Sequence, residues 1–169
     1  PTPMWWTDLN IDNDVIANDC YQLRNSQPDS RGRSTIDGWQ SDDLNFDVNQ
    51  RGILKLVDQV TMISNNIFSS QYLKDDNDRR TLTILNYWVC INPKGGYNAR
   101  HIHPGSFYFH RPDQEDFIIR QHDLRHRDTY YPPVQGRLLL FPSQLAHSVE
   151  SNEMDNDRIA VSFNIGIND

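Results

Sequence analysis

Hydrophobic positions in the first half of the chain recur at helical spacing. A short set comprises Val15, Ile16, Cys20 and Leu23, and it follows three capping candidates, Asp12, Asn13 and Asp14. A longer set lies on one face of a second predicted helix and comprises Ile53, Leu56, Val57, Val60, Ile63, Ile67 and Phe68. Asp47 or Asn49 is the expected cap of this helix, and Gly52 weakens its first turn. Between the helices, Ser26 to Asn45 predicts a loop with Trp39 as its one large anchor.

From Thr81 onward the pattern is that of β-strands. The strand from Thr81 to Asn92 is followed by the turn Pro93-Lys94-Gly95-Gly96 and by a strand that carries His101 and His103. The remaining candidates are Phe107 to His110 and Phe117 to Arg120, both weak, then Gly136 to Phe141, Leu145 to Val149 and Arg158 to Ile167. The last strand alternates between a polar face, with Arg158, Ala160, Ser162 and Asn164, and an apolar one. Such alternation suits the wall of a barrel with a functional lumen.

These elements predict a single domain over residues 1–169 that is mainly β with flanking helices, an α+β fold. Residues 1–80 are expected to form a helical support, and residues 81–169 a β-sandwich or barrel on which the helices pack. At 169 residues the chain is long enough to bury a core of its own.

Composition narrows the function classes. The 16 basic and 23 acidic residues give a net charge of −7 without a basic stripe, which argues against duplex nucleic acid as a partner. No apolar run approaches the roughly 20 residues of a membrane-spanning helix. The two cysteines, Cys20 and Cys90, suggest neither a disulfide framework nor a thiolate cluster, so we expect a cytoplasmic protein. No signal pattern follows Pro1. The oligomeric state stays open, with a homodimer among the options.

Histidines supply the most specific chemical pattern. His101 and His103 are two positions apart on a predicted strand, so both imidazoles should point the same way, and His147 at the start of a later strand can complete a metal site. Three protein ligands leave positions for exogenous oxygen donors. Arg158 can bind a carboxylate in a two-point fork, and Ser162, on the same face, can add a hydroxyl donor.

Other chemistry-bearing residues carry less weight. A lone histidine is more often a structural hydrogen-bonding group, and this is our interpretation of His110, His122 and His126. The four tryptophans could line a substrate groove, although aromatic residues are more often part of the core. They are Trp5, Trp6, Trp39 and Trp88.

Several motifs together resemble one family. They are Gly38-Trp39-Gln40-Ser41, Asn92-Pro93-Lys94-Gly95-Gly96-Tyr97-Asn98, His101-Ile102-His103-Pro104-Gly105-Ser106, Gly136-Arg137-Leu138-Leu139-Leu140-Phe141-Pro142-Ser143, His147-Ser148-Val149 and Arg158-Ile159-Ala160-Val161-Ser162-Phe163-Asn164. The combination is similar to the 2-oxoglutarate- and iron(II)-dependent oxygenases of the uncharacterised, prolyl-hydroxylase-like type.

The resemblance implies a double-stranded β-helix, a jelly-roll or cupin-like barrel. It also implies ferrous iron on His101, His103 and His147, with 2-oxoglutarate held by Arg158 and its neighbour Ser162. Dioxygen would then decarboxylate 2-oxoglutarate to succinate while a C–H bond of a peptidyl side chain or small metabolite is hydroxylated.

The chain departs from this family in two places. The common pattern is His-x-Asp or His-x-Glu with a distal histidine, whereas His103 occupies the carboxylate position here. The segment after Ser106 is also short by one or two strands, since Phe107 runs almost directly into Tyr108-Phe109-His110-Arg111-Pro112-Asp113. Two alternatives therefore stay open. One is a cupin-type three-histidine dioxygenase that does not use 2-oxoglutarate, and the other a non-catalytic β-barrel binding module with a degenerate metal site.

Overall fold

The computed structural model describes residues 4–45, 49–73, 75, 77–103, 120–121, 127–128 and 131–168. Two helices, α1 (Asn13–Ser26) and α2 (Arg51–Tyr72), accompany strands along this part of the chain. The strands are β1 (Trp5–Asp8), β2 (Thr35–Ile36), β3 (Trp39–Gln40), β4 (Thr81–Asn92), β5 (Tyr97–His101), β6 (Arg120–Gln121), β7 (Arg127–Asp128), β8 (Arg137–Leu140), β9 (His147–Val149) and β10 (Arg158–Asn168). The expected mainly β fold with two flanking helices is confirmed at this level.

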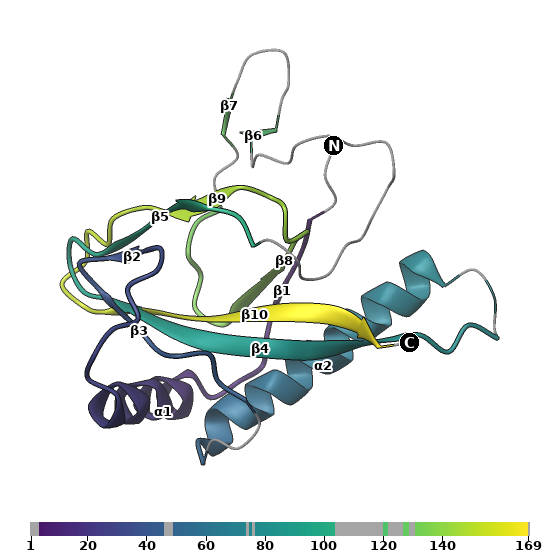
Figure 1. Ribbon diagram of the computed structural model, residues 1–169, viewed down its shortest axis with the longest axis horizontal. Coiled ribbons are helices and arrows are strands. Elements are labelled where there is room, and N and C mark those ends of the chain that lie inside the picture. The colour runs from purple at the N-terminus through teal and green to yellow at the C-terminus, as the bar shows by residue number, and fades with distance from the viewer. Residues whose placement is uncertain are drawn as a thin grey trace.

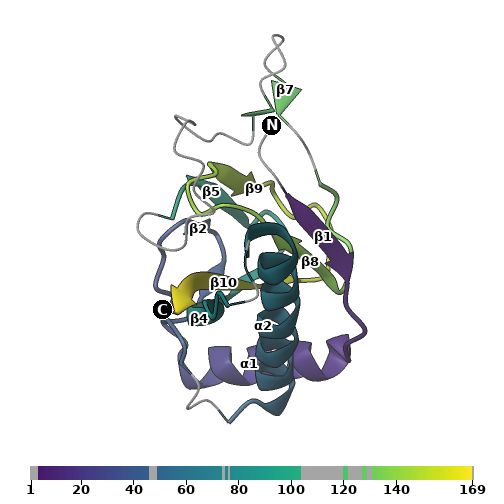
Figure 2. The same cartoon turned by 90° about the vertical axis from the view of Figure 1, so that its right-hand side faces the viewer.

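The strands form antiparallel sheets in two layers. One sheet has the order β10-β4-β3 and the other the order β2-β5-β9, while β1 pairs with β8 and β6 with β7. Both helices lie on the same side of the β10-β4-β3 sheet, and β5 and β9 lie on its opposite side (Figure 1). In the view turned by 90°, the β1-β8 pair stands beside these layers (Figure 2). Residues 1–80 thus contribute three short strands to the sheets in addition to the helices.

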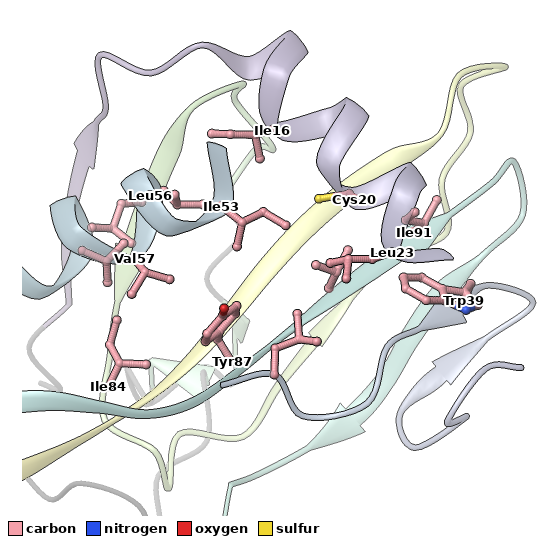
Figure 3. Packing of buried hydrophobic residues seen from close by; sticks show 14 residues of the cluster. Ile16, Cys20, Leu23, Trp39, Ile53, Leu56, Val57, Ile84, Tyr87 and Ile91 are labelled. Carbon is pink, nitrogen blue, oxygen red and sulfur yellow. The ribbon is translucent and has the colours of Figure 1, made fainter. Parts of the chain in front are cut away.

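The pairing of β4 with β10 separates the helix-facing side of the sheet from the side that faces β5 and β9. Ile159 pairs with Ile91 and Val161 with Val89. Ile91, labelled in Figure 3, and Val89 are buried in the hydrophobic core shared with α1 and α2, and the partly buried Ile159 and Val161 pack against that core. Ser162 pairs with Trp88 one residue further along, so both point to the opposite face. The alternation of polar and apolar residues in β10 therefore gives the sheet one face for the core and one for the site.

Close contact between the helices depends on Gly52 and Asp19. A Cβ atom on Gly52 would lie 2.8 Å from Asp19 Oδ2 and 2.8 Å from Val15 Cγ1, so only glycine fits at this crossing. Asp19 Oδ2 accepts hydrogen bonds from the backbone N–H groups of Gly52 (2.7 Å) and Ile53 (3.2 Å). The carboxylate of α1 thus satisfies the first turn of α2, where the side chain at the N-cap position, Gln50, makes no capping bond.

Some predicted boundaries need correction. Of the three capping candidates of the first helix, Asp12 is the N-cap, and its Oδ1 accepts from Val15 N at 3.2 Å. The prediction that Asn49 caps α2 is wrong, because α2 begins one residue later and is capped from α1; Asp47 lies outside the described residues. The predicted loop from Ser26 to Asn45 contains β2 and β3. Its anchor Trp39 is buried and donates from Nε1 to the carbonyl of Gln27 at 2.8 Å.

Two strand predictions are not tested by the described part of the chain. The candidate Phe107 to His110 lies wholly outside it, as does Phe117 to Arg120 except for Arg120, the first residue of β6. Neither described helix combines the length and apolar character that a transmembrane segment requires.

Candidate metal centre

Three imidazoles meet on the side of the β10-β4-β3 sheet that faces away from the helices. His101, His103 and His147 each offer one ring nitrogen, and the three nitrogens lie within 4.8 Å of one another. Their ring centroids are 4.3 Å apart for His101 and His147, 5.0 Å for His101 and His103, and 5.2 Å for His103 and His147. Since a divalent metal lies about 2.0–2.1 Å from each imidazole nitrogen, little side-chain movement would bring all three onto one ion.

Strand pairing positions two of these histidines, and a backbone hydrogen bond outside the strands positions the third. His101 and His147 are register partners across the antiparallel β5-β9 pair, after an irregularity in register between Asn98 and His101. His103 lies beyond the end of β5, so the expectation that it shares a strand face with His101 is wrong. Its backbone N–H instead donates to the carbonyl of Ser143 at 3.0 Å, which holds this turn of chain against the segment before β9. The third imidazole thus reaches the site through a loop contact.

The hydrogen bonds of two histidines fix which ring nitrogen is available. Nδ1 of His101 lies 2.7 Å from the carbonyl of Ala99, and Nδ1 of His147 lies 2.8 Å from the carbonyl of Leu145. A carbonyl only accepts, so each Nδ1 carries a proton, which leaves Nε2 as the ring nitrogen that can bind a metal. Backbone carbonyls that orient a histidine in this way are a usual second layer of metal sites.

Aromatic neighbours enclose the imidazoles. The ring of Trp88 is 5.3 Å from that of His103, and the ring of Phe141 is 4.9 Å from that of His147. Burial, helped by the nearby His147, His101 and Arg33, lowers the pKa of His103 to about 4. Burial also lowers the pKa of His147, against the opposing effect of its bond to Leu145. Both imidazoles are therefore held in the neutral form that binds a metal ion.

A cavity of about 280 Å³ adjoins the triad. Its wall includes His103 and His147 at one end, Ser162 and Asn164 of β10 along one side, and Ser64 of α2. Trp5, Trp88 and Phe141 contribute aromatic surface to its wall, and aliphatic residues, Leu138, Leu139 and Leu140 of β8 among them, also line it. Two of the four tryptophans considered as groove residues thus lie on this cavity, whereas Trp39 is buried in the core and Trp6 is largely exposed.

Arg158 and Ser162 occupy different parts of the site. Ser162 lines the cavity and pairs with Trp88. Arg158 starts β10 opposite Asn92, shares the face of Ser162, and donates from a guanidinium nitrogen to the carbonyl of Gly96 at 3.4 Å. It is not among the residues that line the cavity. Arg158 and Ser162 are four residues apart in β10, which separates their Cα atoms by about 13 Å. Arg158 therefore lies well away, along the strand, from the position of Trp88.

A buried amide network adjoins Arg158. Asn92 donates to Asn98 at 2.7 Å, and Asn98 donates in turn to the Thr35 hydroxyl at 2.9 Å. The Thr35 hydroxyl donates to Gln40 at 3.1 Å, which ties β2 and β3 to the two sheets. These polar groups make the space between the sheets hydrophilic near Arg158, in contrast to the cavity beside the histidines, whose lining is mostly apolar.

Sequence reasoning missed several contributors to this site. The contacts of Ser143, Phe141 and Trp88 with the histidines depend on how loops and sheets meet, and no local pattern announces them. Trp88 had been considered only as one of four possible groove residues, and it could have been assigned to the site face, since it lies two residues from Cys90 and four from Asn92 on the same side of one strand. The other three histidines, His110, His122 and His126, lie outside the described residues.

Comparisons with known proteins agree with the motifs. Residues 108–164 match the family model described as "Putative 2OG-Fe(II) oxygenase", a segment that includes His147, Arg158 and Ser162 but begins after His103. The fold is similar to the crystal structure of a Pseudomonas putida prolyl-4-hydroxylase, with a TM-score of 0.54 and 13% identity over 96% of this chain and 92% of that one. No curated protein matches the sequence.

These findings show what the chain is similar to in sequence and in fold. The match to the family model gives a likeness in sequence, and the match to the solved structure gives a likeness in fold over nearly the whole chain. The predicted resemblance to the 2-oxoglutarate- and iron(II)-dependent oxygenases is thereby confirmed.

Proposed function

We propose that this protein is an iron(II)- and 2-oxoglutarate-dependent dioxygenase with a double-stranded β-helix, in which His101, His103 and His147 hold the metal. The observation that carries the proposal is the shared geometry of His101 and His147. Each donates from Nδ1 to a carbonyl two residues earlier, which leaves Nε2 of each ring for a metal, and each of the three histidines offers a ring nitrogen within 4.8 Å of the others. A packed core does not require three imidazoles whose ring nitrogens converge in this way.

The donor set fits a borderline divalent ion. Imidazole nitrogens suit iron, and three protein ligands leave coordination positions for small oxygen donors. With His103 in place of a carboxylate, the protein contributes no negative charge, so a bound divalent ion keeps its full charge toward other ligands. An anionic cosubstrate such as 2-oxoglutarate is favoured at such a centre by simple electrostatics.

Arg158 and Ser162 are proposed to bind 2-oxoglutarate. A guanidinium group forms two parallel hydrogen bonds to a carboxylate, and Arg158 begins β10 on the face that Ser162 and Trp88 share. Its distance along β10 from the level of the histidines suits a ligand with carboxylates at both ends, one toward the metal and one toward Arg158. When bound, ferrous iron and 2-oxoglutarate supply the activation of dioxygen: one oxygen atom enters a substrate C–H bond as hydroxyl and the other enters succinate, with release of carbon dioxide.

The substrate is proposed to be a peptidyl side chain or a small metabolite. The prolyl-4-hydroxylase is similar in fold at only 13% identity, so its name does not choose between these classes for this chain. A second candidate function is a three-histidine dioxygenase that does not use 2-oxoglutarate. The set of three histidines favours it, because it departs from the set of two histidines and one carboxylate that is usual in non-haem iron oxygenases.

The proposal is tested by measuring succinate formed from 2-oxoglutarate with ferrous iron and ascorbate present. The wild-type protein should form succinate, and His147→Ala should lose this activity because one of three ligands is gone. Ile102→Ala is the matched control, since Ile102 lies between two of the histidines with a largely exposed side chain. Succinate formation that persists unchanged in His147→Ala would refute the proposal.

A further inference from the structure

His103 differs from the other two histidines of the candidate metal centre in how its ring is held. The rings of His101 and His147 each bond through Nδ1 to a backbone carbonyl, whereas the ring of His103 makes no such bond within the described part of the chain. His103 also lies beyond the end of β5, and the bond from its backbone N–H to the carbonyl of Ser143 does not fix its side-chain torsions. The orientation of this imidazole must therefore come from the side chains around it.

Trp88 is the described aromatic neighbour of His103 that is not itself a candidate metal ligand. The two ring centroids are 5.3 Å apart and the ring planes are inclined by 35°, within the range of aromatic contact. The other rings beside His103 are those of His101 at 5.0 Å and His147 at 5.2 Å, and both belong to the same candidate ligand set. The indole of Trp88 thus restricts the orientations open to the His103 ring from outside that set.

Trp88 is itself firmly held. Only 6% of it is exposed, and its backbone lies in β4, the central strand of the β10-β4-β3 sheet, opposite Ser162. Burial raises the pKa of the Cys90 thiol, and a hydrogen bond from the Trp88 side chain is among the contacts that oppose this rise. That bond uses the indole N–H, the only donor of the ring. A ring fixed by a central strand and by a buried hydrogen bond can orient a loop side chain that packs on it.

We propose that Trp88 is a positioning residue, which orients the His103 imidazole so that its ring nitrogen converges with those of His101 and His147 on the metal. Without the indole, the His103 side chain would sample several rotamers, and metal binding would have to order one of them at a cost in affinity. This role rests on the metal centre of the proposed function, but it requires neither 2-oxoglutarate nor a particular substrate.

Calorimetric titration with zinc measures the effect. Trp88→Leu should weaken zinc binding by about three- to tenfold, the cost of ordering one side chain on binding. Trp88→Phe should recover most of the affinity, since it keeps an aromatic ring beside His103. Trp39→Leu is the matched control, because it removes a similarly buried indole from the core on the other face of the sheet. It should lower the melting temperature comparably and weaken zinc binding by less than twofold.

A double-mutant cycle tests whether Trp88 acts through His103. In a His103→Ala background, Trp88→Leu should change zinc affinity by less than twofold, because the ligand that the indole orients is already gone. In a His101→Ala background, the three- to tenfold loss should persist. A loss of the same size with and without His103 would overturn the proposal, and so would unchanged zinc affinity in Trp88→Leu.

A fluorescence measurement with conservative variants covers the case in which Trp88→Leu does not fold. Cobalt(II), a paramagnetic ion that quenches nearby indole emission, should quench the wild type and Trp39→Phe, and should quench Trp88→Phe much less. Equal quenching in the three proteins would separate Trp88 from the bound ion and overturn its role.

The proposed function can fail separately from the role of Trp88, because neither titration uses 2-oxoglutarate. Trp88-dependent zinc binding in a protein that forms no succinate would refute the proposed function and support the positioning role. Succinate formation by the wild type, together with unchanged zinc affinity in Trp88→Leu, would refute the positioning role alone.

Discussion

His101 and His147 are opposite each other across the β5-β9 pair, with ring centroids 4.3 Å apart and Nδ1 of each bonded to a carbonyl two residues earlier. The same local hydrogen bond on two paired strands leaves Nε2 of each ring for a metal. His103 comes to this point from outside the strand, through its backbone bond to Ser143. The metal centre we propose therefore combines two ligands fixed by a sheet with a third fixed by a loop.

Removal of the His101 or His147 side chain should weaken metal binding more than removal of the neighbouring Ile102 side chain. For His101→Ala and His147→Ala, the loss of metal affinity should exceed the roughly 10- to 100-fold that follows removal of a group bonded to a ligand. Titration with ferrous iron or zinc, followed by calorimetry, measures this. Ile102→Ala should bind metal within a few-fold of wild type, and a comparable loss in that control would show that the effect is not specific to the imidazoles.

The metal-free protein should become less stable as the pH is lowered through the range set by the pKa of His103. Burial lowers its pKa to about 4 in the folded protein, whereas an unfolded histidine titrates near 6.5. The folded state thus binds fewer protons, so the contribution is fully present above pH 6.5 and is lost as pH falls toward 4. Between pH 7.5 and pH 5 the loss should approach about 2 kcal/mol, and His147 should add to it in the same direction.

Denaturation with urea at the two pH values measures this difference. His103→Gln removes the titrating group and should make the pH dependence shallower. If the variant and the wild type lose the same free energy of unfolding between pH 7.5 and pH 5, burial of His103 is not the cause.

Asp19 should be a major contributor to the stability of the helical layer. Its carboxylate is buried and accepts from two backbone N–H groups of the first turn of α2. Asp19→Ala leaves both donors without that partner and should lower the free energy of unfolding by about 2–3 kcal/mol. Asp19→Asn keeps an accepting oxygen and should cost less. Asp58→Ala, at an exposed position of α2, is the control and should change stability by less than about 0.5 kcal/mol.

Local pattern was sufficient to predict the regular elements. The predicted strand from Thr81 to Asn92 coincides with β4, and the helical stripe from Ile53 to Phe68 lies within α2. These segments could be predicted because burial of one face imposes a period on the sequence. The cap of α2 could not, because Asp19 is more than 30 residues away from the groups it binds and no local rule links them.

The candidate site, like the fold, could be predicted from local pattern only in part. Spacing suggested that His101 and His103 share a strand face, yet the strand ends at His101 and His103 arrives by another route. The meeting of the three imidazoles was expected, while the mechanism that positions His103 was not.

Arg158 distinguishes the proposed function from a three-histidine enzyme that needs no 2-oxoglutarate. Metal should raise the melting temperature of both wild type and Arg158→Ala, because the histidines are intact in each. Further addition of 2-oxoglutarate should raise it only in wild type, since a ligand that prefers the folded state stabilises it by mass action. Loss of a two-point bond to a carboxylate should weaken the binding of 2-oxoglutarate by about 10- to 100-fold.

Arg158→Lys should recover part of the shift in melting temperature, because an ammonium group keeps the charge but cannot form two parallel hydrogen bonds. Arg79→Ala, which removes an exposed arginine just before β4, should respond as wild type does. An equal 2-oxoglutarate shift in Arg158→Ala and wild type would exclude Arg158 as the anchor, and absence of the shift from all four proteins would favour the enzyme without 2-oxoglutarate.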